Sequence, residues 1–222
     1  CREGFAGFNV THPFKTVILA HLDELSEDAK DIGAVNTVTI RDGILKGYNT
    51  DWIGFAAQYQ SLRETGISSG PVLVLGAGGA GRAVIHALTA AGVSDIRIYD
   101  PDTANATALA AENKCVTVAG DAITAALDSV GIVNASTVGM QGKGGLPIDK
   151  SALRSDHWIA EVVYFPVETP LVLHVRALGC RVATGDIMCL EQAIAGFDLM
   201  TSLSADRQAM VNCIAGLLSE RA

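Results

Sequence analysis

Short apolar runs alternate with segments of helical periodicity through most of the chain. Residues 72–75 are a four-residue run of valine and leucine, as in a strand buried on both faces. Apolar side chains then recur at helical spacing over residues 83–91, and residues 96–99 alternate apolar and polar positions. The pattern predicts a strand, a helix and a second strand in succession, which is typical of a parallel sheet covered by helices.

The same alternation continues towards the C-terminus. It predicts helices at 104–113, 122–127 and 169–178, strands at 115–118, 131–134, 158–164 and 181–183, and a helical region running on and off from 185 to 218. Strands and helices at this spacing predict an α/β protein with a Rossmann doubly wound parallel sheet.

The first part of the chain has a different pattern. We expect a helix over residues 14–22, with Pro13 in its first turn and Thr11 as its cap. The other elements expected here are a strand near 5–10, a short helix at 26–32, strands at 34–40 and 44–48 joined by a hairpin turn at 41–43, and a helix at 52–63. The turn-rich stretch 65–70 then leads into the first apolar strand described above.

A glycine-rich turn follows the first apolar strand and leads into its helix. Gly76, Gly78 and Gly81 fit the pattern G-x-G-x-x-G. The first allows a tight turn, the second lets the backbone approach a pyrophosphate, and the third lets helix and strand pack closely. The helix N-terminus also favours phosphate. A ligand-free glycine turn is the alternative, but the strand–turn–helix context favours a dinucleotide site.

An acidic residue ends the second strand. Asp100 lies about 20 residues beyond Gly81, where a carboxylate can accept hydrogen bonds from the ribose of a dinucleotide. The 2′-phosphate of NADP would place like charge beside it. We therefore predict NAD rather than NADP as the cofactor. Asp102 is a neighbouring acid that could take the same role.

Composition narrows the class of protein. Of 222 residues, 49% are hydrophobic and 18% are charged, which is enough apolar material for a substantial core. The formal net charge is −8, and no basic cluster provides an electrostatic footprint for nucleic acid. No apolar run reaches membrane-spanning length, and the start of the chain lacks a signal-peptide pattern. We expect neither a nucleic-acid nor a membrane partner.

The cysteines and histidines indicate no metal site. The five cysteines are scattered without a C-x-x-C pair, so we expect free, mostly buried thiols and a cytoplasmic location. None of the five histidines belongs to a cluster with metal-ligand spacing. Dinucleotide chemistry requires an acid–base group elsewhere. Lys15 and Asp51 are candidates, although a lysine in a first helical turn is usually a solvated charge.

Seven motifs in order carry a resemblance. They are G-F-N-V-T-H-P-F-K (7–15), G-A-V-N-T (33–37), G-Y-N-T-D-W-I-G-F (47–55), G-A-G-G-A-G (76–81), N-A-S-T-V-G-M (134–140), V-V-Y-F-P-V-E-T (162–169) and G-D-I-M-C-L-E-Q-A (185–193). Together they resemble the shikimate/quinate dehydrogenase family over essentially the whole chain.

The resemblance implies roles for individual residues. Lys15 and Asp51 match the catalytic pair that contacts the hydroxyl being oxidised. The substrate-binding positions it implies are Thr11, Lys15, Asn36, Asp51, Tyr164 and Gln192. The positions lining the dinucleotide are Gly76, Ala77, Gly78, Gly79, Ala80, Gly81, Asp100, Ser136, Thr137, Val162, Gly185 and Met188. For Tyr164 and Met188, core packing is the alternative.

The resemblance also implies an activity and a division of the chain. The activity is hydride transfer between NAD(P) and the ring hydroxyl of shikimate, with quinate as a second substrate. The division is a smaller α/β substrate domain (1–51, incomplete at its N-terminus), a Rossmann domain (52–187) and C-terminal helices that return to and complete the substrate domain (188–222). Its partner is a small molecule, and the protein is a monomer or homodimer. A related polyol or aminoshikimate dehydrogenase, or a truncated non-catalytic NAD-binding module, remain as alternatives.

The chain departs from the family pattern at several points. We expect a further βαβ stretch with a Ser-x-Ser motif before Cys1, and this sequence begins after it. Asp100-Pro101-Asp102-Thr103 stands where NADP-using members carry Asn-Arg-Thr/Ser, which favours the NAD-using branch. Ser136-Thr137 replaces a common Thr-Pro, and Glu161 replaces a common aspartate.

Overall fold

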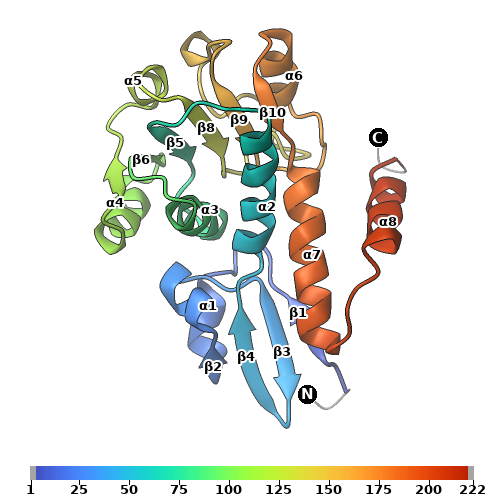
Figure 1. The fold of residues 1–222 in the computed structure, drawn as a ribbon. Coiled ribbons are helices and arrows are strands. Elements are labelled where there is room, and N and C mark those ends of the chain that lie inside the picture. The colour runs from blue at the N-terminus through green and yellow to red at the C-terminus, as the bar shows by residue number, and fades with distance from the viewer. Residues whose placement is uncertain (1–3, 220–222) are drawn as a thin grey trace.

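A six-stranded parallel sheet forms the larger part of the molecule (Figure 1). The computed structural model describes residues 4–219. The strands are β5 (Val72–Leu75), β6 (Ile96–Tyr99), β7 (Val116–Val118), β8 (Gly131–Asn134), β9 (Trp158–Glu161) and β10 (Arg181–Ala183). Their order is β10-β9-β8-β5-β6-β7, and every pairing is parallel. The order reverses between β5 and β8, which is the switch point where ligands bind in such sheets.

Helices cover both faces of this sheet. They are α2 (Asp51–Glu64), α3 (Gly79–Ala90), α4 (Thr103–Glu112), α5 (Ala122–Leu127) and α6 (Pro170–Ala177). Val72 and Val74 of β5 belong to a core cluster with α2, α3 and α4. Leu73 and Leu75, which alternate with them, belong to a second cluster with α5 and α6. Both faces of β5 are therefore buried, which confirms the predicted doubly wound α/β fold.

A smaller four-stranded sheet lies at the other end of the molecule. Its strands are β1 (Gly7–Asn9), β2 (Glu24–Leu25), β3 (Thr37–Arg41) and β4 (Ile44–Tyr48), in the order β1-β3-β4-β2. β3 and β4 form the predicted hairpin, and Asp42 and Gly43 at its turn have φ of 50° and 83°. Two consecutive positive φ values suit the twist of a two-residue hairpin. Helix α1 (Glu27–Ile32) also matches the prediction.

Two helices connect the two sheets. Figure 1 shows α2 and α7 (Gly185–Thr201) side by side along the length of the molecule, and the two helices pack against each other. Helix α7 also contacts β1 and β3 of the smaller sheet. Helix α8 (Arg207–Ser219) follows and packs against α7. Asp51 is the first residue of α2 and follows the end of β4 by three positions, so it lies where this helix leaves the smaller sheet.

The predicted helix at 14–22 is wrong. Only a 3₁₀ helix, η1 (Val17–His21), forms there, and residues 11–16 make turns around a cis His12–Pro13 bond. Thr11 and Pro13 therefore do not begin a helix. The carbonyl of Lys15 accepts a hydrogen bond from the Val35 amide at 2.8 Å. This tertiary contact holds Lys15 in place instead of a regular helix.

Two further expectations need correction. Strand β9 ends at Glu161, so residues 162–164, predicted to be strand, belong to the loop that follows it. The four cysteines in the described region are free, but none is fully buried: Cys115, Cys180 and Cys189 are half-buried and Cys213 is exposed. Cys1 lies outside the described residues. A second 3₁₀ helix, η2 (Lys150–Ala152), precedes β9.

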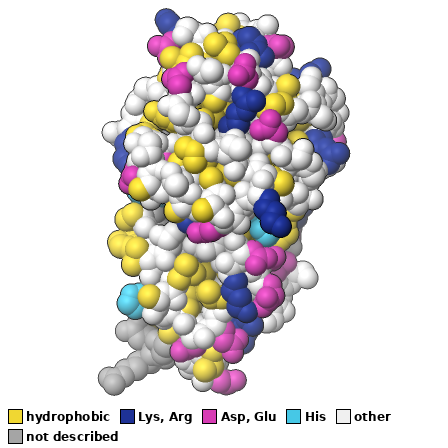
Figure 2. Space-filling view, turned by 90° about the vertical axis from the view of Figure 1, so that its left-hand side faces the viewer, with side chains coloured by type: hydrophobic (Ala, Val, Ile, Leu, Met, Phe, Trp, Pro, Cys, Tyr) yellow, Lys and Arg dark blue, Asp and Glu magenta, His cyan; other side chains and the backbone are white. Residues whose placement is uncertain are grey.

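The surface carries both signs of charge. On the face shown in Figure 2, Lys and Arg side chains stand beside Asp and Glu side chains. Ion pairs in the described part of the chain include Lys30 with Glu27 and Arg82 with Glu112. Among residues 4–219, no helix combines the length and apolar character needed to span a membrane.

Candidate active site

Two adjoining cavities lie between the two sheets. The larger cleft has a volume of about 660 Å³, and the smaller pocket about 290 Å³. The cleft is lined by residues that follow β5, β6, β8 and β9, at the carboxyl ends of these strands. The residues that line both cavities are Thr11, Lys15, Ala80, Val162 and Tyr164. A ligand in the cleft and one in the pocket would therefore have these side chains as common neighbours.

Lys15 and Asp51 form an ion pair in the smaller pocket. The Lys15 Nζ lies 2.7 Å from Asp51 Oδ2, and the two side chains are 18% and 6% exposed. Asp51 opens α2, where the positive end of the helix dipole favours a carboxylate. Its amide donates to Asn49 Oδ1 at 3.0 Å. The resulting pair is a cation and an anion held together at the pocket wall and partly protected from water.

The side chain of Asn36 fixes the other oxygen of Asp51. Its Nδ2 donates to Asp51 Oδ1 and to Thr50 Oγ1, both at 2.9 Å. Its Oδ1 accepts from the Thr50 amide at 2.7 Å, which sets the orientation of the whole amide group. Asn36 is 3% exposed. Each oxygen of Asp51 thus has its own donor, and the carboxylate cannot turn without breaking one of them.

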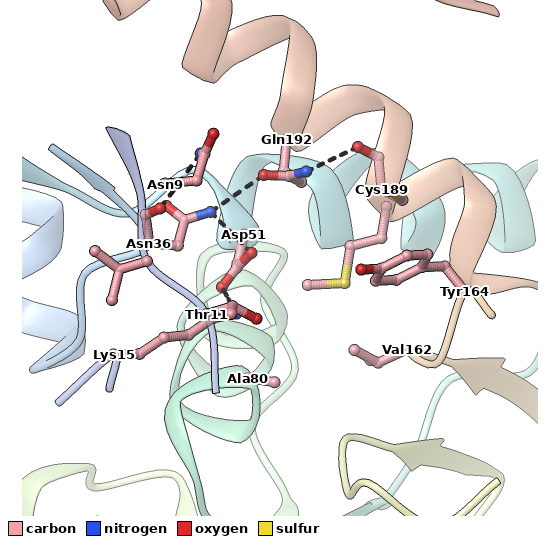
Figure 3. A pocket seen from close by; sticks show the side chains of 12 residues that line it. Asn9, Thr11, Lys15, Asn36, Asp51, Ala80, Val162, Tyr164, Cys189 and Gln192 are labelled. Carbon is pink, nitrogen blue, oxygen red and sulfur yellow. Dashed lines mark hydrogen bonds and ion pairs between the residues drawn. The ribbon is translucent and has the colours of Figure 1, made fainter. Parts of the chain in front are cut away.

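Gln192 and Tyr164 complete the pocket. Asn36 Nδ2 also lies 3.3 Å from Gln192 Oε1, and Gln192 Nε2 donates to the carbonyl of Cys189 at 3.0 Å. Figure 3 shows Lys15 and Thr11 on one side of the pocket and Tyr164 and Val162 on the other. Tyr164 is 51% exposed, so it is not a core residue. The pocket presents hydroxyl, amide, carboxylate and ammonium groups to a small polar molecule.

The glycine turn has the geometry that its sequence predicts. Gly76 has φ of 106°, which glycine adopts without strain. A Cβ at Gly78 would meet no atom within 4 Å, so this position leaves open space above the start of α3. A Cβ at Gly81 would lie 2.0 Å from the carbonyl oxygen of Gly76, and one at Gly79 would lie 2.8 Å from Lys15 Cβ. The stem of Lys15 therefore packs directly on the turn.

Asp100 lies in the cleft with a fixed carboxylate. Its Oδ2 accepts from the Ala77 amide at 2.7 Å, and its Oδ1 accepts from the Asp102 amide at 2.9 Å. Asp102 instead caps α4 by accepting from the Ala104 amide at 3.1 Å. It is not among the cleft-lining residues. Of the two acids that the sequence left open, Asp100 is the one that faces the cleft.

The other residues matched to the cofactor lie at three different places. Gly76, Gly78, Gly79, Ala80, Ser136, Thr137 and Val162 line the cleft. Met188 lines the smaller pocket, where it is 4% exposed. Ala77, Gly81 and Gly185 line neither cavity. A Cβ at Gly185 would lie 2.4 Å from the Val163 carbonyl oxygen, so this glycine allows α7 to begin close to the β9 loop.

Sequence reasoning missed several lining residues. Asn9 and Cys189 line the smaller pocket, and His12, Asn105 and Gln141 line the cleft. Two of them, Asn9 and Cys189, could have been found from their spacing in the sequence. Asn9 lies two positions before Thr11, so in extended backbone both point to one side. Cys189 lies one helical turn before Gln192 on α7, so both face the same cavity.

Comparison with known proteins identifies the family. The family described as Shikimate dehydrogenase substrate binding domain matches residues 1–38. The chain is 44% identical over 218 residues to a shikimate dehydrogenase (NADP(+)) of Arthrobacter sp. (strain FB24), covering 94% of this chain and 74% of that protein. The chain belongs to the shikimate dehydrogenase family. This membership confirms the resemblance stated from the motifs.

Solved structures of the shikimate dehydrogenase family share the fold. A quinate dehydrogenase from Corynebacterium glutamicum in complex with NAD has a TM-score of 0.88 and 38% identity, covering 97% of this chain and 79% of that one. A shikimate 5-dehydrogenase from Thermus thermophilus in complex with NADP(H) and shikimate has a TM-score of 0.84 and 36% identity, covering 97% and 80%. The relatives thus include users of either dinucleotide.

Proposed function

We propose that this chain is an NAD-dependent dehydrogenase that oxidises the ring hydroxyl of shikimate, with quinate as a second substrate. The observation that carries the proposal is the Lys15–Asp51 pair, which lies in a polar pocket opening onto the cleft above the glycine turn. The proposal includes the division into a substrate domain (1–51), a dinucleotide domain (52–187) and C-terminal helices (188–222).

The cleft fits a dinucleotide. Gly78 leaves open space beside the N-terminus of α3, whose first amides have no partner within the helix. Ser136 and Thr137 also line the cleft, and the Ser136 backbone lies beside Gly76 of the turn. A bound nicotinamide dinucleotide would supply the hydride acceptor for alcohol oxidation. The glycine turn and α3 would hold its pyrophosphate, and Asp100 its ribose.

Lys15 and Asp51 are proposed to handle the proton of the substrate hydroxyl. Oxidation of an alcohol removes a proton from oxygen as well as a hydride from carbon. Lys15 lines both the pocket and the cleft and pairs with Asp51 in the pocket. The pair therefore lies where the proton and the hydride would leave the same position of a bound ring. Lys15 Nζ, as the neutral amine, accepts the hydroxyl proton and becomes the ammonium paired with Asp51, which Asn36 holds in position.

The neighbouring polar groups are proposed to select a polyhydroxylated ring. Thr11, Asn36, Tyr164 and Gln192 surround the pair with hydroxyl and amide groups. A ring that lacks a matching hydroxyl would leave such groups without partners, which a buried site strongly disfavours. This argument supports a cyclic polyol as the substrate class.

Asp100 supports NAD rather than NADP. Its carboxylate is held in the cleft by two backbone amides, so it cannot swing away from a 2′-phosphate. Two negative groups at close range in a partly buried site repel by several kcal/mol as an order-of-magnitude estimate. The ribose hydroxyls of NAD can instead donate to this carboxylate.

A substrate and cofactor panel tests the proposal. The protein is assayed with NAD and NADP against shikimate, quinate, an aminoshikimate and other polyols, and NAD binding is measured by calorimetry. We expect the highest kcat/KM with NAD and shikimate. If only a different polyol is turned over, that polyol and not shikimate is the substrate. NAD binding without turnover of any of them would favour a non-catalytic module.

A further inference from the structure

Glu161 is a buried acid outside both cavities. It is the last residue of β9 and is 0% exposed. Asn134 Nδ2 donates to both of its carboxylate oxygens, at 2.9 and 3.1 Å. The Val163 amide and the Thr169 hydroxyl each donate to it at 2.9 Å. Three separate segments of the chain therefore direct donors at one carboxylate.

Two of these segments form walls of the cleft. Asn134 ends β8, and its Oδ1 accepts from Ser136 Oγ at 2.7 Å and from the Ser136 amide at 3.2 Å. The same Asn134 amide donates to the Val138 carbonyl at 3.0 Å. Ser136 and Val138 line the cleft on the β8 side, and Val163 lines it on the β9 side. Glu161 thus links the loop after β8 to the loop after β9.

The third segment anchors this link to the rest of the sheet. Thr169 caps α6 by accepting from the Val172 amide, while its hydroxyl donates to Glu161. From the other face, Gln58 of α2 donates to the main-chain carbonyl of Glu161 at 2.8 Å. Glu161 is held from both faces of the sheet, so movement of its carboxylate requires movement of the cleft walls.

We propose that Glu161 is a positioning residue for the dinucleotide, and that its negative charge holds the loops after β8 and β9 in the geometry that binds the cofactor. The proposal rests on the dinucleotide site proposed above and adds a residue that does not touch the ligand. An ionised carboxylate has only acceptors, which match the donors of Asn134, Val163 and Thr169. A protonated carboxyl would turn one O–H towards these donors and weaken the link.

The charge of Glu161 is therefore expected to depend on pH near neutrality. Burial raises the pKa of Glu161 from 4.5 to about 7, although the donors from Asn134, Val163 and Thr169 oppose the shift. The side chains that face the carboxylate, Asn134 from β8 and Thr169 from the segment before α6, do not titrate. By linkage, a dinucleotide that prefers the ionised form must release a proton from Glu161 when it binds near pH 7.

Glu161→Gln tests the role of the charge with little change of shape. We measure the Kd of NAD by calorimetry at pH 6, 7 and 8 in two buffers of different ionisation enthalpy. At pH 8 we expect Glu161→Gln to bind NAD about tenfold more weakly, the size of one lost charge-assisted hydrogen bond. At pH 6 the wild-type Kd for NAD should approach that of Glu161→Gln, and at pH 7 wild type should release protons when NAD binds. The Kd of Glu161→Gln should not change with pH in this way, and its binding of NAD should release no proton from this site.

Two further variants make the result specific. Glu168→Gln makes the same change at an exposed residue of the same loop, paired with Arg176 on the surface, and should bind NAD as wild type does. Thr169→Val removes one donor to Glu161 and should move the pH dependence of the NAD Kd to higher pH. It provides the readout if Glu161→Gln does not fold, as judged by circular dichroism and melting temperature.

The outcomes separate this proposal from the proposed function. If Glu161→Gln folds and binds NAD with wild-type affinity at every pH, or if Thr169→Val leaves the pH profile unchanged, the positioning role is wrong. Wild type that binds no NAD at any pH would instead overturn the dinucleotide site itself. A selective rise in the KM for NAD, with kcat and the KM for shikimate within about twofold of wild type, would support the positioning role.

Discussion

Lys15 and Asp51 lie 36 positions apart in the chain, yet Lys15 Nζ and Asp51 Oδ2 are 2.7 Å apart. Two contacts hold Lys15 in the position from which it reaches Asp51. The carbonyl of Lys15 accepts from the Val35 amide, and a Cβ on Gly79 would lie 2.8 Å from Lys15 Cβ. Lys15 is thus held between the smaller sheet and the start of α3. The pair lies beside one of the contacts between the smaller sheet's part of the molecule and α3, which also include the packing of Ile32 and Ala34 on Ala83.

Removal of the Lys15 amine should abolish most of the activity. We expect Lys15→Ala to lower kcat by about 10²–10⁴-fold, as for loss of general acid–base catalysis. Lys15→Arg should not restore it, because a guanidinium does not give up its proton at neutral pH. Steady-state rates with NAD and shikimate test this, with Lys30→Ala, in an exposed pair with Glu27, as the control. A Lys15→Ala variant as fast as wild type would exclude the proton-transfer role.

Removal of the Asp100 charge should change the choice of cofactor. Asp100→Asn keeps an oxygen that can accept from the Ala77 or Asp102 amide but removes the repulsion of a 2′-phosphate. We expect kcat/KM to fall about tenfold with NAD and to rise with NADP. The matched control is Asp102→Asn, which alters the cap of α4 outside the cleft and should leave the ratio of the two values unchanged. If Asp100→Asn leaves the ratio of kcat/KM with NAD to kcat/KM with NADP unchanged, Asp100 does not select the cofactor.

Two glycines of the turn should respond differently to alanine. Gly78→Ala places its Cβ in open space, so we expect an unchanged melting temperature but NAD binding at least about tenfold weaker, because the methyl group meets the pyrophosphate. Gly81→Ala places its Cβ 2.0 Å from the Gly76 carbonyl oxygen and should lower stability by about 1–3 kcal/mol. Thermal melts and NAD titrations of both variants measure the contrast. Equal melting temperatures in the two variants would contradict the predicted difference between the open position of Gly78 and the close contact at Gly81.

Glu161 should make the fold less stable as pH rises. Its pKa is raised to about 7 in the fold, so the fold keeps this proton where the unfolded chain has lost it. The stabilisation is fully present below pH 4.5 and is lost as pH rises through 7. Between pH 5 and 8, the unfolding free energy of wild type relative to Glu161→Gln should fall by about 2–3 kcal/mol. Urea unfolding of both proteins at pH 5 and pH 8 measures this change. A difference in unfolding free energy that is the same at both pH values would contradict the raised pKa of Glu161.

Local patterns predicted most of the elements because their causes lie within a few residues. The apolar run of β5 and the glycines that follow it predict strand, turn and helix without further information. The hairpin of β3 and β4 follows in the same way from Asp42 and Gly43. The helix expected at 14–22 did not form, because the carbonyl of Lys15 bonds to the Val35 amide of a distant segment. Local periodicity contains no information about such a partner.

The sequence by itself determined the class of fold, the dinucleotide turn and, through its motifs, the family of the protein. Only the tertiary structure decided that Asp100 and not Asp102 faces the cleft, that Asn36 orients Asp51, and that Glu161 links the cleft walls. The physical reason is range. Backbone preferences and apolar periodicity act over one or two turns of chain, whereas these contacts join segments that become neighbours only when the strands pair into the two sheets.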